Sequence, residues 1–269
     1  MKKNNNYYTD IYSYFFFKKK NNKRMMKKIY SFLRVDSTFM TTSHNRMFDV
    51  NKVLKKYINK YFSKKIEICD FAISSGQSTY ELYKTLNKHK IKNVYGFDKK
   101  IYIKIFKIQK LILVYGLKND LLMVEFNKYC LRYRYFFLFK KVEKILFNLL
   151  YFFNIKYKSL KLLIPSLNGI KKFKFFEQDI FNVDKKYFNF FDVVRVSNLL
   201  NYAYFSEEKL KKAVLNIKKI SKENSIILIN RTPNGKFHNN GSFFIKKKGK
   251  FILLEDVNEG SEIKELMLI

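Results

Sequence analysis

A turn of small residues and three strand-ending acids are the features of this sequence best suited to hold a ligand. The acids end or follow apolar runs, and they are Asp70, Asp98 and Asp179. The small residues follow the first acid within "DFAISSG", and they are Ala72, Ser74 and Gly76. Small residues let a backbone approach a ligand closely, and carboxylates accept hydrogen bonds from hydroxyl or amino groups. The pattern predicts a cofactor-binding turn, and the alternative is an ordinary strand, turn and helix with turn-forming acids.

Apolar runs and helical patterns alternate along the chain and would position these residues. The predicted strands are residues 65–72, 93–98, 173–181, 191–200 and 225–232. Helical spacing of apolar residues predicts helices over 48–62, 78–89 and 206–220, the second capped by Ser78 or Thr79 with Glu81 as its partner. This alternation predicts an α/β fold with a mostly parallel sheet. Such sheets bind ligands beyond the carboxyl ends of their strands, where the strand order reverses.

The spacing of the turn separates two kinds of nucleotide-binding fold. Dinucleotide-binding folds space their glycines two and then three residues apart, whereas this turn has a spacing of two and two. "DFAISSG", Asp98, "EQDIF" and "FDVVRVSNLLNY" occur in the order of the motifs of class I S-adenosylmethionine-dependent methyltransferases, which the chain resembles. It is nearest to the chemotaxis-receptor-methyltransferase-like branch, through Asn198, the apolar pair after it and Tyr202. Ala72 and Ser74 stand where that family usually has glycine.

The resemblance implies a Rossmann-like methyltransferase fold: a mostly parallel seven-stranded sheet with helices on both faces and an inserted hairpin and helix. It implies S-adenosyl-L-methionine as cofactor, with Asp98 on the ribose hydroxyls and Asp179 facing the adenine amino group. The cofactor-binding residues that it implies are Asp70, Ala72, Ser74, Gly76, Asp98, Asp179, Ile180 and Asn198. We expect methyl transfer to an oxygen or nitrogen atom of a small or lipid-like molecule. The alternatives are methyl transfer to a protein side chain, an RNA methyltransferase and a non-catalytic Rossmann-like binding module.

Catalytic residues are not defined by any motif. A deprotonating group would be needed for some acceptors, and the candidates are Tyr202 and His238. No cysteine and histidine cluster has metal-ligand spacing, so we expect no metal.

The chain is expected to comprise an arm and one domain. Residues 1–45 show no sustained periodicity of apolar residues and are interpreted as a loose basic arm. Residues 46–269 are interpreted as the methyltransferase domain. An insertion spans about 101–170, with a hairpin around "LKN" and a helix at 135–153 that has a very wide apolar face. We expect this helix to be a lid or an extra layer packed on the sheet. The alternative is an interfacial helix that makes peripheral contact with a membrane or contains an apolar substrate.

The net charge of +33 would by itself suggest nucleic acid or an anionic membrane as partner. Of the 55 basic residues 48 are lysine, and phosphate and base recognition favours arginine. We therefore interpret the charge as a solvated lysine surface encoded by A+T-rich codons, and nucleic acid is the less favoured partner. The apolar run before Asp70 predicts that Cys69 is a buried free thiol, which fits a reducing compartment. A cytoplasmic protein is expected, with membrane contact through 135–153 as the alternative.

Overall fold

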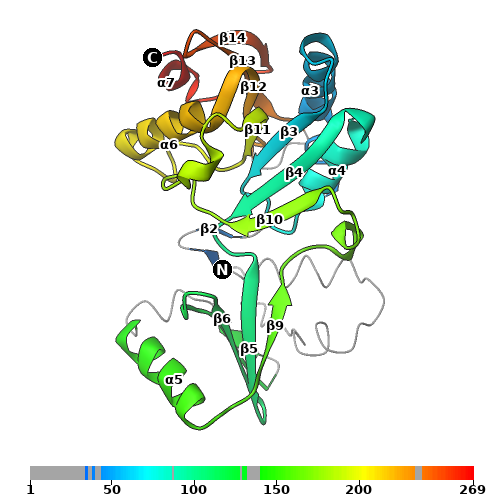
Figure 1. The fold of residues 1–269 in the computed structure, drawn as a ribbon. Helices are drawn as coiled ribbons and strands as arrows, with labels where there is room; N and C mark the ends of the chain where they lie inside the picture. The colour runs from blue at the N-terminus through cyan, green and yellow to red at the C-terminus, as the bar shows by residue number, and fades with distance from the viewer. Residues whose placement is uncertain are drawn as a thin grey trace. The chain divides into compact units, whose positions relative to one another are not determined.

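The chain forms two compact units (Figure 1). The structure is a computed structural model, and it describes residues 34–35, 38–39, 44–86, 88–127, 129–131, 140–233 and 238–269. The larger unit comprises Ser43–Lys99 and Leu163–Ile269, and the smaller unit comprises Met1–Thr42 and Lys100–Leu162. The arm predicted over 1–45 lies almost wholly outside the described residues, as does the first part of the helix predicted at 135–153.

A seven-stranded sheet forms the centre of the larger unit, in the order β10-β4-β3-β11-β12-β13-β14. Its strands are β3 (Ile66–Phe71), β4 (Ile91–Asp98), β10 (Phe173–Glu177), β11 (Phe191–Ser197), β12 (Ser221–Arg231), β13 (Asn240–Lys247) and β14 (Lys250–Val257). The first five strands pair in parallel, and β13 and β14 continue the sheet antiparallel. The predicted Rossmann-like α/β fold with a mostly parallel seven-stranded sheet is therefore confirmed.

Helices cover both faces of this sheet, as predicted. One face packs against α3 (Phe48–Tyr61) and α4 (Gln77–Thr85), through a core that includes Leu54, Leu82 and Ile68. The other face packs against α6 (Glu207–Ile220) and α7 (Lys264–Leu268), where Cys69 is buried. Successive residues of a strand point to opposite faces, so these two cores take alternate residues of the same strands.

The predicted cap of α4 is wrong. The helix begins at Gln77, its N-cap is Gly76, and Gly76 has the left-handed φ of +75°. Thr79 donates its hydroxyl hydrogen to Asp70, and Glu81 accepts from the Gln77 side chain at 2.6 Å. The hydroxyl at the third helical position is therefore used for a contact across the fold, which the local sequence does not reveal.

The smaller unit contains a separate antiparallel sheet in the order β8-β7-β6-β5-β9. Its strands are β5 (Tyr102–Ile108), β6 (Leu111–Gly116), β7 (Leu121–Phe126), β8 (Tyr129–Leu131) and β9 (Tyr157–Lys161). The short strands β1 (Arg34–Val35) and β2 (Thr38–Phe39) pair with each other. Strands β6 and β7 are the predicted hairpin, and α5 (Lys140–Phe152) is the predicted helix. Phe147 and Leu150 of α5 pack against Phe106 and Tyr115, so the helix is an extra layer on this sheet.

Candidate functional site

The order of the larger sheet reverses between β3 and β11. On one side of this point the neighbouring strands are β3, β4 and then β10. On the other side they are β11 and then β12. In open parallel sheets this reversal leaves room for a ligand beyond the carboxyl ends of the strands. The segment Ala72–Gly76 leaves β3 at this point, and Asp98 ends the neighbouring strand. The predicted site residues therefore lie where the fold favours a ligand.

Three alternate residues of the turn adopt left-handed backbone conformations. The φ angles are 59° at Ala72, 52° at Ser74 and 75° at Gly76. A Cβ at the third position would lie 2.4 Å from Leu167 Cδ1, so any residue other than glycine there would require the Leu167 side chain to move. Ala72 and Ser74 carry a Cβ in a region that costs an ordinary residue roughly 1–2 kcal/mol. The turn thus has the backbone of a glycine-rich loop although only one of the three residues is glycine.

We expect Ser74→Gly to raise the free energy of unfolding by about 1 kcal/mol, because it removes the left-handed strain. No hydrogen bond of the Ser74 hydroxyl would be lost in the described structure. Ser206→Gly is the matched control, because Ser206 is an N-cap with φ of −64° and should change by only about a few tenths of a kcal/mol. Urea denaturation measures both. A Ser74→Gly protein less stable than the wild type would contradict this assignment of strain.

Asp98 holds the turn against the end of β4. Its Oδ2 accepts a hydrogen bond from the Ser74 backbone N–H at 2.8 Å. The Asp98 carbonyl accepts from the Gln178 N–H at 2.9 Å, just beyond β10. The turn and the ends of β4 and β10 are therefore joined through one residue, and the structure brings Ser74 and Asp98 together.

Asp179 lies just beyond β10, next to the residue that follows Asp98. Its carboxylate is 3.2 Å from the Lys99 ammonium, and it accepts from the Phe181 N–H at 3.0 Å. Ile180 is buried, and its carbonyl accepts from the Asn216 side chain of α6 at 2.8 Å. This loop is consequently fixed on one side by Lys99, which follows β4, and on the other side by α6.

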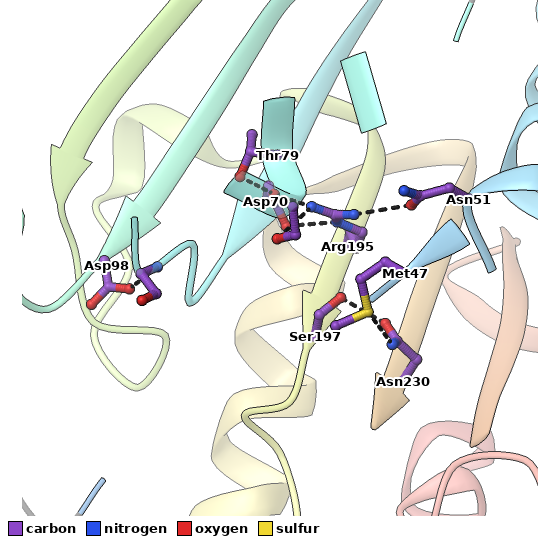
Figure 2. A network of polar contacts seen from close by, with 10 residues as sticks. Met47, Asn51, Asp70, Thr79, Asp98, Arg195, Ser197 and Asn230 are labelled. Carbon is purple, nitrogen blue, oxygen red and sulfur yellow. Dashed lines mark hydrogen bonds and ion pairs between the residues drawn. The ribbon is translucent and has the colours of Figure 1, made fainter. Parts of the chain in front are cut away.

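Asp70 belongs to β3, just before the turn, and forms a buried ion pair with Arg195 (Figure 2). The two residues are direct neighbours on β3 and β11, and their side chains are 1% and 0% exposed. Arg195 donates through Nε at 2.8 Å and through Nη2, and the Thr79 hydroxyl donates to Asp70 at 2.6 Å. Arg195 Nη1 also donates to Asn51 of α3 at 3.0 Å. Both carboxylate oxygens of Asp70 are thus occupied by groups of the fold.

Sequence reasoning missed Arg195. A single arginine inside the apolar strand "FDVVRV" was a usable signal, because a buried guanidinium requires a carboxylate partner. Identifying the partner required the register of β3 against β11, which local patterns do not supply.

Asn198 connects the ends of β11 and β12. It has a φ of 57°, and its Oδ1 accepts from the Thr232 backbone N–H at 2.7 Å. Beside it, Ser197 donates to Asn230 at 2.6 Å, and the Asn230 amide contacts Met47 Sδ at 3.2 Å (Figure 2). A buried polar network therefore supports the strand ends on this side of the reversal, and its members outside Asn198 were not predicted.

Tyr202 and His238 are both exposed. Tyr202 follows β11 and is 48% exposed, while His238 precedes β13. Their participation in proton removal stays a prediction.

Four buried polar atoms around the strand ends have no hydrogen-bond partner among the described residues. They are Ser74 Oγ, Ser75 Oγ, Asn201 Oδ1 and Asn240 Oδ1. Two of them belong to the turn itself, and native proteins rarely leave buried hydroxyl groups unpaired. The donors and acceptors present suit a ligand that carries hydroxyl and amino groups, so the residues fit an adenosine-containing cofactor. Within the described ranges no group of three or more His, Cys, Asp or Glu residues could hold a metal ion.

No described helix is long and apolar enough to cross a membrane.

Comparison with known proteins finds only solved structures of low similarity. No protein-family model matches the sequence, and no curated protein matches it. Among solved structures, the CurJ carbon methyltransferase is 14% identical, with a TM-score of 0.40 over 80% of this chain and 40% of that one. A putative S-adenosyl-L-methionine-dependent methyltransferase from Methanococcus maripaludis is 13% identical, with a TM-score of 0.35 over 80% of this chain and 65% of that one. This chain thus spans 40% and 65% of the lengths of these two proteins.

A third solved structure comes from Plasmodium falciparum. It is a putative protein-L-isoaspartate O-methyltransferase in complex with S-adenosyl-L-homocysteine, 18% identical, with a TM-score of 0.36 over 85% of this chain and 77% of that one. All three structures are methyltransferases. Their similarity to this chain is low.

Proposed function

We propose that this protein is an S-adenosylmethionine-dependent methyltransferase. The observation that carries the proposal is the turn at the sheet reversal, in which Ala72, Ser74 and Gly76 are all left-handed and Asp98 accepts from the Ser74 N–H. A backbone that keeps this conformation at two non-glycine residues stores strain, and stored strain is concentrated at functional sites. The unpaired hydroxyl groups of Ser74 and Ser75 lie in the same turn.

Each residue near the strand ends has a role in this proposal. Asp98 receives the ribose hydroxyl groups, Asp179 and Ile180 border the adenine, and Ala72, Ser74 and Gly76 form the turn that the methionine part lies against. Asp70 is a positioning residue: with Arg195 and Thr79 it fixes the base of the turn. Asn198 holds the opposite strand ends in place through Thr232.

Methyl transfer from this cofactor is an in-line displacement on an electrophilic methyl group that the cofactor supplies when bound. The work left to the chain is to bind, to orient the acceptor and to exclude water. The acceptor in this proposal is an oxygen or nitrogen atom of a small or lipid-like molecule, with His238 receiving its proton and Tyr202 hydrogen-bonding the acceptor. The chemotaxis-receptor-methyltransferase-like branch is the proposed relationship, through Asn198 and Tyr202.

Titration calorimetry tests the proposal. We expect S-adenosylmethionine and S-adenosylhomocysteine to bind in the micromolar range, and ATP, which shares the adenosine but carries a triphosphate, to bind far more weakly. Absence of heat with millimolar S-adenosylmethionine would contradict the proposal. Binding of the cofactor without methyl transfer to any supplied acceptor, including RNA, would favour the binding module instead.

A further inference from the structure

The smaller unit exposes a patch of large apolar side chains at the end of α5. The apolar patch consists of Ile145, Leu149, Tyr151, Phe152, Phe153 and Tyr157. Phe152 is 81% exposed and Phe153 is 66% exposed, and their rings are 5.3 Å apart. Six large apolar residues exposed within thirteen positions form a local concentration rather than scattered surface residues. Large apolar side chains exposed together on one segment are typical of an interaction site.

Helix α5 does not need this surface for its own packing. Phe147 and Leu150 are buried against the sheet, and the Phe147 ring lies 5.0 Å from Tyr115. Ile145, Leu149 and Phe152 follow one another at intervals of four and three, so they share the face opposite to those buried residues. The helix therefore has one apolar face for the fold and a second one that faces outward.

Positive charge surrounds the apolar patch. Lys144, Lys156 and Lys158 are exposed beside it. Residues 100–162 contain fourteen Lys or Arg residues against three Asp or Glu residues, a net charge of +11. An apolar surface with a lysine border matches an anionic lipid surface, because apolar side chains enter the headgroup region while lysines reach its phosphates.

Lys104 holds two tyrosines of the patch in place. Its ammonium lies 5.8 Å from the centre of the Tyr151 ring and 5.5 Å from that of Tyr157, and 3.4 Å from the Tyr151 hydroxyl oxygen. Both tyrosines stay about 45% exposed. Tyrosines with a buried flank and a polar tip are typical of the boundary between lipid and water.

We infer that the apolar patch docks this protein on an anionic membrane surface. The inference does not depend on the proposed transferase activity. Self-association through the same patch would bring two copies of residues 100–162, each with a net charge of +11, together, and the like charges would oppose it. A nucleic acid could stack its bases on Phe152 but would leave the aliphatic Ile145 and Leu149 without a matching apolar surface. A bilayer satisfies the apolar side chains and the lysines at once.

The experiment is cosedimentation of the full chain with vesicles of phosphatidylcholine containing about 30% phosphatidylserine, and with vesicles of phosphatidylcholine alone. We expect Phe152→Ser with Phe153→Ser to lower the partition coefficient on the anionic vesicles by roughly tenfold or more. Lys144→Gln with Lys156→Gln should lower it by about 30-fold, since each lysine near the surface contributes about a factor of five. Pure phosphatidylcholine should bind the wild type weakly.

Matched controls lie on other surfaces. Phe48→Ser removes an exposed helical phenylalanine of α3, and Lys209→Gln with Lys212→Gln removes two exposed charges of α6. These variants should sediment like the wild type, and all variants should keep the wild-type melting temperature because the changed side chains are exposed.

Four outcomes would overturn the inference. The first is patch variants that bind vesicles like the wild type, and the second is an equal loss in the control variants. The third is a loss caused instead by Lys18→Gln with Lys19→Gln, which would assign binding to the N-terminal segment. The fourth is a wild-type dimer that becomes monomeric in the Phe152→Ser, Phe153→Ser variant, in analytical ultracentrifugation, without any vesicle binding by the wild type.

Discussion

Arg195→Met is expected to lower the free energy of unfolding by about 3–5 kcal/mol, because it leaves a buried carboxylate without its cation. Asp70 is 1% exposed, and only the Thr79 hydroxyl would still donate to it. Asn51 of α3 would lose the donor to its side-chain oxygen as well. Chemical denaturation followed by circular dichroism measures the change. A loss below about 1 kcal/mol would mean that water screens the Asp70–Arg195 ion pair.

Two variants separate the buried charge from the substitution itself. Arg231 forms an ion pair with Glu262 at 2.9 Å that is about one-third exposed, so Arg231→Met should cost at most about 1 kcal/mol. Combining Arg195→Met with Asp70→Leu removes both charges, and most of the lost stability should return. Failure of the double variant to recover would assign the cost to packing and not to the unpaired carboxylate.

The sequence was sufficient to predict the central sheet and its helices because their signals are local. Near-continuous apolar runs such as "IEICDF" and "FDVVRVS" are typical of strands buried on both faces of a parallel sheet, and both form such strands. Helix α6 has Leu210, Ala213 and Ile217 buried on one side, as its spacing predicts.

The separate sheet of the smaller unit was only partly predictable. The hairpin β6–β7 has a short connection, so a turn signal between two apolar runs reveals it. Strand β9 pairs with β5 across more than fifty residues, and its exposed, lysine-rich sequence "YKSLK" gives no strand pattern. Such pairings depend on tertiary contacts that periodicity does not contain.

The candidate site was also only partly predictable from the sequence. The position of the turn and its acid Asp98 could be predicted from order along the chain, whereas left-handed conformations at Ala72 and Ser74 could not, since these residue types disfavour them. Asn230 and Asn239 also escaped prediction. Their amide and carbonyl groups pair at 3.1 Å inside a network that joins distant segments, and only the folded chain brings these segments together.

In the proposed function Asp98 accepts hydrogen bonds from two groups, the turn and the ribose. Its Oδ2 already accepts from the Ser74 N–H at 2.8 Å. An asparagine at position 98 could still accept this hydrogen bond through its side-chain oxygen, but it would replace the second carboxylate oxygen by an N–H donor. An alanine would remove both functions. The two substitutions therefore distinguish a ligand-binding carboxylate from one that only holds the turn.

Asp98→Ala is expected to weaken binding of S-adenosylmethionine by about 10- to 100-fold, because the ribose hydroxyl groups lose a charged acceptor. Asp98→Asn should weaken it by about tenfold while leaving the melting temperature unchanged, since the hydrogen bond to Ser74 is kept. Asp184→Ala is the matched control: Asp184 caps the short helix η5 (Lys185–Tyr187), and its loss should leave affinity unaltered. Titration calorimetry measures all three. If Asp98→Asn binds the cofactor as tightly as the wild type, Asp98 serves the turn alone and the ribose must be held elsewhere.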